Sequence, residues 1–374
     1  KLARWMHKSA LIRSLNHKAG CHNTLPSYTG YAEPLPDIVS ARDTYPPGMG
    51  SVCEYLRDGR GELPDYVYMP CYLGWGQSIR RPGPYGGFLG QRCDPLFTEC
   101  KPHLDPGAKP ESPGHPQVLR GAPLLPAAAT GGDLTLDRLD GRRSLLKQFD
   151  DGVRRVEAAG QFDRTRQRAF GLLTSAKARE AFDLDTVDPR VLDRYGRTLF
   201  GQSAVIARRL VEAGVRFVNV TWDLFWDRVQ VDYDAWDTHT RNFPILKDNK
   251  LPGFDQVFTA LLEDLDARGL LDETLVVVTS EMGRTPKING NGGRDHWTYC
   301  YGTLFAGAGI KGGAVYGASD AQAAYVKDLP VSPADVCCTV YECLGIDPEM
   351  TVPDKTGRPV PIGQGGRPIA GILA

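Results

Sequence analysis

An amphipathic helix that leads directly into an apolar strand constrains the fold of this chain more than any other feature. Residues 254–265 carry apolar side chains at helical spacing, and Gly269 follows as a helix stop. Residues 274–279 (TLVVVT) then form a short run of apolar and β-branched residues. A run of this kind is typical of a parallel strand that helices cover on both faces.

The same order of helix and strand recurs along the chain. Helical spacing extends over residues 142–213, and residues 215–222 (VRFVNVTW) follow as a β-rich segment. Residues 10–15 and 303–306 are two further predicted strands, and Ser332 begins a last helix with an N-cap pattern. This alternation predicts an α/β fold with a doubly wound, mostly parallel sheet.

Residues 34–145 differ in character from the rest of the chain. Proline and glycine dominate this segment, and stretches such as residues 81–87 (RPGPYGG) cannot hold a regular strand ladder. We expect a loop-rich excursion over the surface of a single domain that spans residues 1–374. The sequence opens on Lys1 without a helix cap or an initiator Met, so we also expect it to begin partway through the natural chain.

Composition narrows the range of partners. The formal net charge of −1 provides no long-range field for nucleic acid, and no nucleic-acid partner is expected. No apolar run approaches the roughly 18 residues that a membrane span requires, so no span is expected. The nine cysteines do not show the spacing of a paired metal site, and Cys93 and Cys100 are the preferred disulfide candidates.

Side chains that can bind a metal ion follow two of the predicted strands. Ligands collect outside the carboxyl ends of the strands in an open parallel sheet, because loops and helix N-termini meet there. Residues 236–239 (WDTH) follow one strand, and residues 280–286 (SEMGRTP) follow another. Asp237 and His239 offer an oxygen and a nitrogen, which suits zinc, iron or manganese better than calcium. A surface aspartate beside a satisfied histidine is the alternative.

Glu281 and the segment after a glycine-rich loop extend this polar edge. A carboxylate directly after an apolar strand needs a cation or hydrogen-bond donors, and an ion pair with Arg284 is the alternative for Glu281. Residues 289–293 (NGNGG) permit close backbone approach and deliver Asp295 and His296 to the same edge. Glycine is equally typical of a plain solvent loop.

The histidines support one shared centre. Four of the seven lie in loops that follow predicted strands, and these are His17, His22, His239 and His296. The predicted metal ligands are Asp237, His239, Glu281 and His296. Asp295, His17 and His22 are further candidates.

Several motifs along the chain are specific in combination. They comprise residues 12–17 (IRSLNH), 22–23 (HN), 73–78 (LGWGQS), 86–90 (GGFLG), 181–184 (AFDL), 193–196 (DRYG), 236–239 (WDTH), 281–286 (EMGRTP), 293–297 (GRDHW) and 344–347 (LGID). Together they resemble the family described as domain of unknown function 1501, which is similar to exported sulfatases of the alkaline phosphatase superfamily. The resemblance covers nearly the whole chain.

The resemblance implies a three-layer, alkaline-phosphatase-like α/β domain, export to the periplasm or beyond, and metal-dependent hydrolysis of phosphate or sulfate esters. Asp237, His239 and His296 match the ligands of one metal ion. Glu281 stands where the superfamily has an acid followed by a histidine. Met282 follows it here, so one zinc-like site is expected rather than two. The first acidic ligand of the superfamily lies on an N-terminal strand that this sequence lacks.

The motifs leave the nucleophile and the substrate open. Cys21 and Thr24 are the candidate nucleophiles, and Arg284 or Arg294 is expected to hold the anion bidentately. The expected ligand is a small anionic ester or a sulfated or phosphorylated glycan. The alternative is a noncatalytic binding or assembly protein on the same fold, in which residues 34–145 contact a protein partner.

Overall fold

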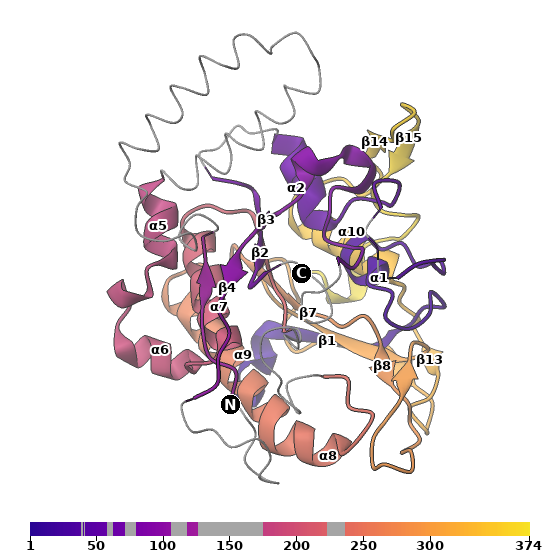
Figure 1. Cartoon of the computed structure of the whole chain (residues 1–374). Coiled ribbons are helices and arrows are strands. Elements are labelled where there is room, and N and C mark those ends of the chain that lie inside the picture. Colours follow the sequence, from indigo (N-terminus) through magenta and orange to yellow (C-terminus); the bar gives the residue numbers. More distant parts are fainter. Residues whose placement is uncertain are drawn as a thin grey trace.

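The computed structural model describes residues 1–38, 40, 42–57, 63–71, 80–105, 118–125, 175–222 and 236–374 (Figure 1). The motif at residues 73–78 and residues 142–174 of the predicted helical stretch lie outside these ranges. The described residues form a mixed α/β structure with several sheets.

Two sheets form the centre of the structure. The first has the strand order β11-β1-β10-β7, and the second has the order β3-β2-β6. Their bounds are Val315–Tyr316 for β11, Ser9–Leu15 for β1, Tyr301–Gly307 for β10, Leu275–Val278 for β7, Leu96–Phe97 for β3, Tyr66–Met69 for β2 and Phe217–Val220 for β6. The four strands predicted from the sequence are therefore confirmed as β1, β6, β7 and β10.

The strand directions differ between the two sheets. In the second sheet β2 is parallel to both β3 and β6. In the first sheet β1 is parallel to β11, but β10 is antiparallel to both β1 and β7. The expectation of a mostly parallel sheet must therefore be corrected for the first sheet. Parallel neighbours need a long crossover, whereas the chain between β7 and β10 holds only the short pair β8 (Gly283–Arg284) and β9 (His296–Trp297).

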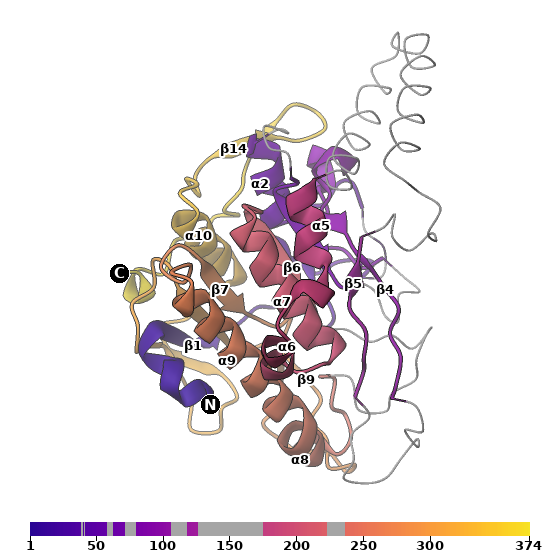
Figure 2. The same ribbon diagram turned by 90° about the vertical axis from the view of Figure 1, so that its left-hand side faces the viewer.

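Two long helices cover one face of these strands. Leu210 of α7 (Leu199–Glu212) packs with Val218 of β6. Leu262 of α9 (Leu251–Ala267) packs with Val276 of β7. Figure 2, viewed from this side, shows α7 and α9 next to each other. The apolar stripe predicted over residues 254–265 is therefore the buried face of α9.

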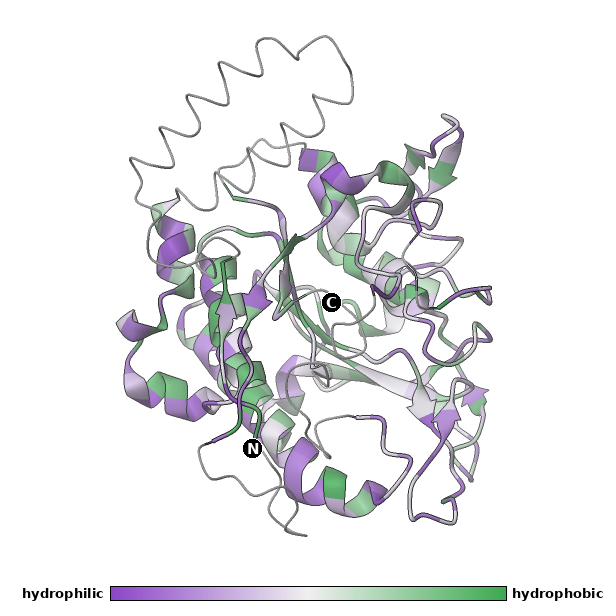
Figure 3. Ribbon diagram, viewed as in Figure 1, coloured by the Kyte–Doolittle hydropathy of each residue, from purple (hydrophilic) through white to green (hydrophobic). Residues whose placement is uncertain are grey.

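Two other helices cover the opposite face. Phe217 of β6 and Val277 of β7 pack into a cluster that includes Val52 of α2 (Met49–Arg57) and Val336 of α10 (Pro333–Cys343). Alternate residues of one strand thus contact different helix layers, which is the pattern of a sheet covered on both faces. Figure 3 shows hydrophobic colouring on several of the central strands and on parts of the helices that cover them.

Local sequence signals set the ends of the helices. The Ser332 hydroxyl accepts from the Asp335 backbone N–H at 3.1 Å, and the Asp335 carboxylate accepts from the Ser332 N–H at 2.8 Å. This capping box is the one predicted at the start of the last helix. The helical pattern around residues 195–210 is interrupted, because Gly196 takes φ 84° after α6 (Pro189–Tyr195) and Thr198 caps α7.

The segment from residue 34 to 145 contributes to the core, which corrects its description as a surface excursion. Its described part contains α2 and the fully buried strand β2, the middle strand of the parallel sheet. Tyr66 and Tyr68 are among the largest fully buried side chains. Four-residue β2 lies between glycine- and proline-rich stretches, so its short apolar run was concealed by their turn signals.

The remaining elements are short. They are η1 (Leu2–Lys8), α1 (Leu25–Thr29), η3 (Gly87–Leu89), η4 (Gln91–Cys93), β4 (Glu99–Cys100), β5 (Pro123–Leu124), α5 (Ala176–Phe182), η6 (Leu184–Thr186), α8 (Asn242–Ile245), η7 (Leu246–Lys250), β12 (Ala318–Ser319), β13 (Val326–Asp328), β14 (Thr351–Pro353), β15 (Pro359–Pro361) and η8 (Ala370–Ile372). Within the described ranges, no helix has both the length and the apolar composition needed to cross a membrane.

Candidate metal centre

The loops after β1 and β7 meet at one edge of the four-stranded sheet. His17 lies shortly after β1, and its Nε2 is 2.9 Å from the backbone carbonyl of Glu281, which lies shortly after β7. Ser27 of α1 donates to the carbonyl of Ser280 at 3.1 Å. Because β1 and β7 are each antiparallel to β10, their carboxyl ends point the same way. The candidate residues therefore gather where strand ends place ligands in α/β sheets.

Asp237 lies within a group of three side chains that could hold a metal ion. The group is His22, Asp237 and His296, and its candidate ligand atoms lie within 4.8 Å of one another. His296 Nε2 is 3.0 Å from Asp237 Oδ1, and His22 Nε2 is 3.4 Å from Asp237 Oδ2. The two imidazoles thus approach different oxygens of one carboxylate.

His239 stands beside this group. Its Nε2 is 3.1 Å from Asp237 Oδ1 and 2.8 Å from His296 Nε2. With His22, three imidazole Nε2 atoms surround a single carboxylate. Three nitrogens and one oxygen form a donor set that suits zinc.

Glu281 orients His22 from behind. Glu281 Oε1 is 2.7 Å from His22 Nδ1, on the side of the ring opposite to Asp237. Arg81 is buried, and its Nη2 donates to Glu281 Oε2 at 2.5 Å and to the His22 carbonyl at 2.6 Å. One guanidinium therefore fixes both members of the pair. Carboxylates that hold the outer nitrogen of a ligating histidine are a general feature of metal sites.

Asp295 orients His239 in the same way. Asp295 Oδ1 is 2.8 Å from His239 Nδ1 and also accepts from Asn289 Nδ2 at 3.1 Å. The same amide nitrogen of Asn289 lies 3.0 Å from the His239 carbonyl. Asn289 therefore has the same role in the second pair as Arg81 has in the first. Each donates hydrogen bonds both to the carboxylate and to the backbone carbonyl of the histidine.

The backbone at both histidines is constrained. A Cβ atom on Gly293 would overlap the His239 carbonyl, so only glycine lets the loop at residues 289–293 approach this closely. The Arg294 N–H then donates to the Thr238 carbonyl at 3.0 Å. His22 has φ 54°, in the left-handed region that few residues other than glycine occupy. The hydrogen bond from Arg81 to its carbonyl helps to hold this conformation.

The histidine nitrogens and carboxylate oxygens that face one another around Asp237 favour a bound cation. A neutral histidine that donates from Nδ1 to a carboxylate keeps a lone pair on Nε2. If His22 and His239 are both neutral and donate from Nδ1 to Glu281 and Asp295, their Nε2 lone pairs face the acceptor oxygens of Asp237. Only a proton or a metal ion between them relieves the repulsion. Ligand atoms at about 2.1 Å from a tetrahedral zinc ion lie about 3.4 Å apart, close to the distances from Asp237 to the histidines.

The pKa values reflect the same concentration of acceptors. Burial alone would lower the pKa of His22, but hydrogen bonds to Asp237 and Glu281 outweigh it and raise the pKa to about 9. For Asp237, burial opposes ionisation, yet His22, Arg284 and His296 lower its pKa far below the usual range. Burial lowers the pKa of His296 despite its bond to Asp237. Without a metal ion, His22 is the group that carries the proton.

The structure brings most of the predicted ligands together and changes their roles. Asp237, His239 and His296 converge as the sequence predicts. Glu281 also lies at the centre, but its two carboxylate oxygens contact His22 and Arg81. The three residues proposed as further candidates have different positions. His22 belongs to the three-residue group, Asp295 contacts His239, and His17 contacts backbone atoms near Ala19 and Glu281.

The two arginines predicted to bind an anion are engaged with the protein itself. Arg284 forms an ion pair with Asp237 and donates to the carbonyls of Trp236 and Arg294. Arg294 donates to the carbonyls of Thr285 and Pro286. Both side chains brace the loops around the centre in this conformation.

The two candidate nucleophiles differ in position. Thr24 is buried, and its hydroxyl donates to the Pro82 carbonyl. Cys21 is exposed beside the centre, and its pKa is raised by burial and by the charges of Glu281 and Asp237, which outweigh Arg284. Its sulfur is therefore a thiol at neutral pH in the metal-free protein.

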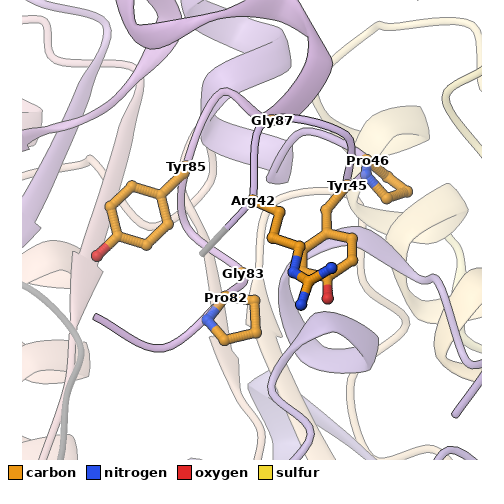
Figure 4. Close-up of a pocket in the computed structure, with 7 residues that line it drawn as sticks. All are labelled: Arg42, Tyr45, Pro46, Pro82, Gly83, Tyr85 and Gly87. Carbon is orange, nitrogen blue, oxygen red and sulfur yellow. The ribbon is translucent and has the colours of Figure 1, made fainter. Parts of the chain in front are cut away.

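A small pocket elsewhere contains none of the metal-centre residues. Figure 4 shows its lining, which is formed by Arg42, Tyr45, Pro46, Pro82, Gly83, Tyr85 and Gly87. Its arginine lies 3.5 Å from the carboxylate of Asp37. The pocket therefore adds no group to the metal centre.

Arg81 is the residue that sequence reasoning missed. It lies in a proline- and glycine-rich segment without periodicity, 200 residues before Glu281. Its only sequence signal is its place beside Pro82 after another arginine, which indicates a turn and not a partner. Burial of its guanidinium is visible only in three dimensions.

Comparisons with known proteins give the chain a family. No curated protein and no solved structure matched it. One family model, described as protein of unknown function (DUF1501), matches residues 1–373. The match covers the metal centre and both central sheets. The chain therefore belongs to the DUF1501 family.

Proposed function

We propose that this protein is a metal-dependent hydrolase of phosphate or sulfate esters that uses one zinc-type cation. The observation that supports it most is the convergence of three Nε2 atoms on Asp237. Lone pairs that the carboxylates of Glu281 and Asp295 direct toward Asp237 are costly to a protein without a cation to receive them. In this proposal His22, Asp237 and His296 bind the ion, and His239 completes the set or faces the substrate.

A bound divalent cation supplies Lewis acidity toward an ester oxygen and lowers the pKa of an attacking group. The protein contributes orientation and proton transfer. Arg81 and Glu281 keep His22 Nε2 directed inward. The His239 side chain is 42% exposed, so its imidazole is open to a substrate, and Asp295 holds its Nδ1 and thereby orients Nε2.

The proposal extends to substrate class and location. An alkaline-phosphatase-like arrangement, export, and a small anionic ester or a sulfated or phosphorylated glycan as ligand rest on the motif resemblance. A negatively charged ester also fits a centre that combines a divalent cation with an exposed imidazole.

Metal content and ester hydrolysis test this function together. We would remove metal with a chelator, titrate zinc by calorimetry, and assay p-nitrophenyl phosphate and p-nitrophenyl sulfate. Asp237→Asn should abolish stoichiometric zinc binding and hydrolysis. Asp272→Asn is the matched control, because this aspartate is 86% exposed and forms a long ion pair with Lys8 at 3.8 Å. Failure of the unaltered protein to bind zinc, manganese or iron would reject a metal centre.

A noncatalytic metal-binding or assembly protein is the second candidate function. It is favoured by Thr24, whose hydroxyl is buried on a carbonyl, and by the two arginines that are engaged with the protein. In this alternative residues 34–145 would contact a protein partner. Zinc binding without turnover of either ester, across a range of pH, would favour it over the hydrolase.

A further inference from the structure

Two cysteines outside the metal centre lie side by side in the interior. Cys71 follows β2, and Cys100 ends β4. Their sulfur atoms are 3.6 Å apart, and the side chains are 5% and 3% exposed. The two residues are separated by 29 positions in the sequence.

The backbone around this pair is already fixed. Thr98 donates from its N–H to the Tyr68 carbonyl at 3.0 Å and from its hydroxyl to the Pro70 carbonyl at 2.7 Å. These two bonds hold the chain before Cys71 against the chain before Cys100. Leu119 and Leu199 pack with both cysteines. Bonding of the sulfurs therefore requires little movement of the chain, which is the main geometric demand on a disulfide.

We propose that Cys71 and Cys100 are a disulfide site that is closed by a disulfide oxidant, such as oxidised glutathione or an oxidised dithiol protein. The Cys71 thiolate attacks one sulfur of the oxidant and releases the first thiol. The Cys100 thiolate then attacks the Cys71 sulfur of the mixed disulfide and releases the second. Two protein thiols are oxidised to one cystine while one disulfide is reduced to two thiols.

The site differs from the pair that sequence spacing preferred. Cys93 lies in the large core cluster with Val52 and Leu89, whereas Cys100 belongs to the small cluster beside α7. In the structure, the sulfur of Cys100 therefore lies beside that of Cys71, a residue that is farther away in the sequence than Cys93. A bond from Cys71 closes the chain across β3 and joins the end of the central parallel strand to the β4–β5 ribbon. The inference is independent of the proposed hydrolase function.

Thiol counting and peptide mapping test the site. The full chain is refolded from denaturant with a mixture of reduced and oxidised glutathione, so that burial does not block access. Remaining thiols are then alkylated in denaturant. We expect the nine thiols of the sequence to fall to seven, with a Cys71–Cys100 peptide in a nonreducing digest. Reduction should lower the melting temperature by about 5 to 10 °C.

Two variants make the result specific. Cys71→Ser should keep all eight of its thiols, and Cys93→Ser should fall from eight to six and keep the same linked peptide. A refolded protein that retains nine thiols, or that links Cys100 to another cysteine, overturns the proposal. If the protein does not refold, native protein is taken directly from cells and alkylated at once. Presence of the Cys71–Cys100 peptide in its nonreducing digest then supports the proposal, and absence of that peptide overturns it.

Discussion

Two imidazole–carboxylate pairs flank Asp237, and they have nearly the same geometry in very different surroundings. The inner pair joins His22 to Glu281 at 2.7 Å, and the outer pair joins His239 to Asp295 at 2.8 Å. The side chains of the inner pair are 16% and 18% exposed, and those of the outer pair are 42% and 53% exposed. The same contact is therefore much less screened by water in the inner pair.

The residues that hold the two carboxylates differ in charge, in agreement with this difference in burial. The inner carboxylate is held by the guanidinium of Arg81, whereas the outer one is held by the neutral amide of Asn289. A buried carboxylate needs a charged partner, and an exposed one can rely on water. The inner pair is therefore held more rigidly, while the imidazole of the outer pair has more freedom to reorient.

Removal of Arg81 should have the largest effect on this arrangement. Arg81→Ala removes the guanidinium from Glu281, leaves this carboxylate paired with His22, and should reduce the free energy of unfolding by about 3 to 5 kcal/mol. Chemical denaturation of the metal-free protein measures this change. Arg120→Ala removes the exposed pair with Asp105 and serves as the control, with a much smaller expected change. Equal effects in both variants would contradict the buried character of the inner pair.

The second-largest effect concerns the pH dependence of zinc affinity, which should be dominated by the inner pair. The pKa of His22 is raised to about 9, so near pH 7 zinc must displace its proton. Affinity should therefore rise about tenfold per pH unit, or about 100-fold between pH 6 and pH 8. The same proton stabilises the metal-free fold below pH 6.5, and this contribution is lost as the pH rises through about 9. Competition titrations with a chelator measure the first effect and urea denaturation the second.

A control variant identifies the proton. Glu281→Gln removes one of the two carboxylates that raise the pKa of His22, so the rise in zinc affinity should end at a lower pH. An unchanged pH profile in this variant would assign the proton to another group.

Isosteric changes of the two carboxylates compare the pairs directly. Glu281→Gln should weaken zinc binding by about 10- to 100-fold at pH 8, because the amide no longer accepts as an anion from His22 Nδ1. Asp295→Asn removes the same contact from an exposed histidine, and water can replace it, so a loss below about tenfold is expected. Calorimetry on both variants at one pH gives the comparison. A larger loss for Asp295→Asn would make His239 the more important ligand.

The sequence was most informative where chemistry follows a regular element. Asp237 and His296 were expected to meet because each comes after a strand or a glycine-rich loop at one sheet edge, and they lie 3.0 Å apart. The strand at β7 and the helix at α9 were predictable from apolar spacing alone. Local periodicity records such features because it is set by the same burial that builds the core.

The features that escaped prediction depend on long-range contacts. Arg81 meets Glu281 across 200 residues, and no local pattern marks either residue as the partner of the other. The antiparallel direction of β10 was also not predictable. It depends on whether the chain between β7 and β10 contains a crossover helix, and this chain segment does not. His22, a further candidate from the sequence, contacts Asp237 across two loops that are far apart in the sequence. Spacing along the chain carries no record of such pairings.

The smallest expected effect concerns the amide that supports the outer pair. Asn289→Ala removes the donor shared by Asp295 and the His239 carbonyl, but Asp295 keeps its contact with the imidazole. Zinc affinity should fall by no more than about threefold, because the amide is only half-buried and water can replace its hydrogen bonds at little cost. Asn289→Asp keeps the size and places a like charge beside Asp295, so it should weaken the pair more than alanine does. If both variants bind zinc as tightly as the unaltered protein, the hydrogen bond from Asn289 to Asp295 does not affect zinc binding. The difference between the two pairs would then lie in the burial of the inner pair alone.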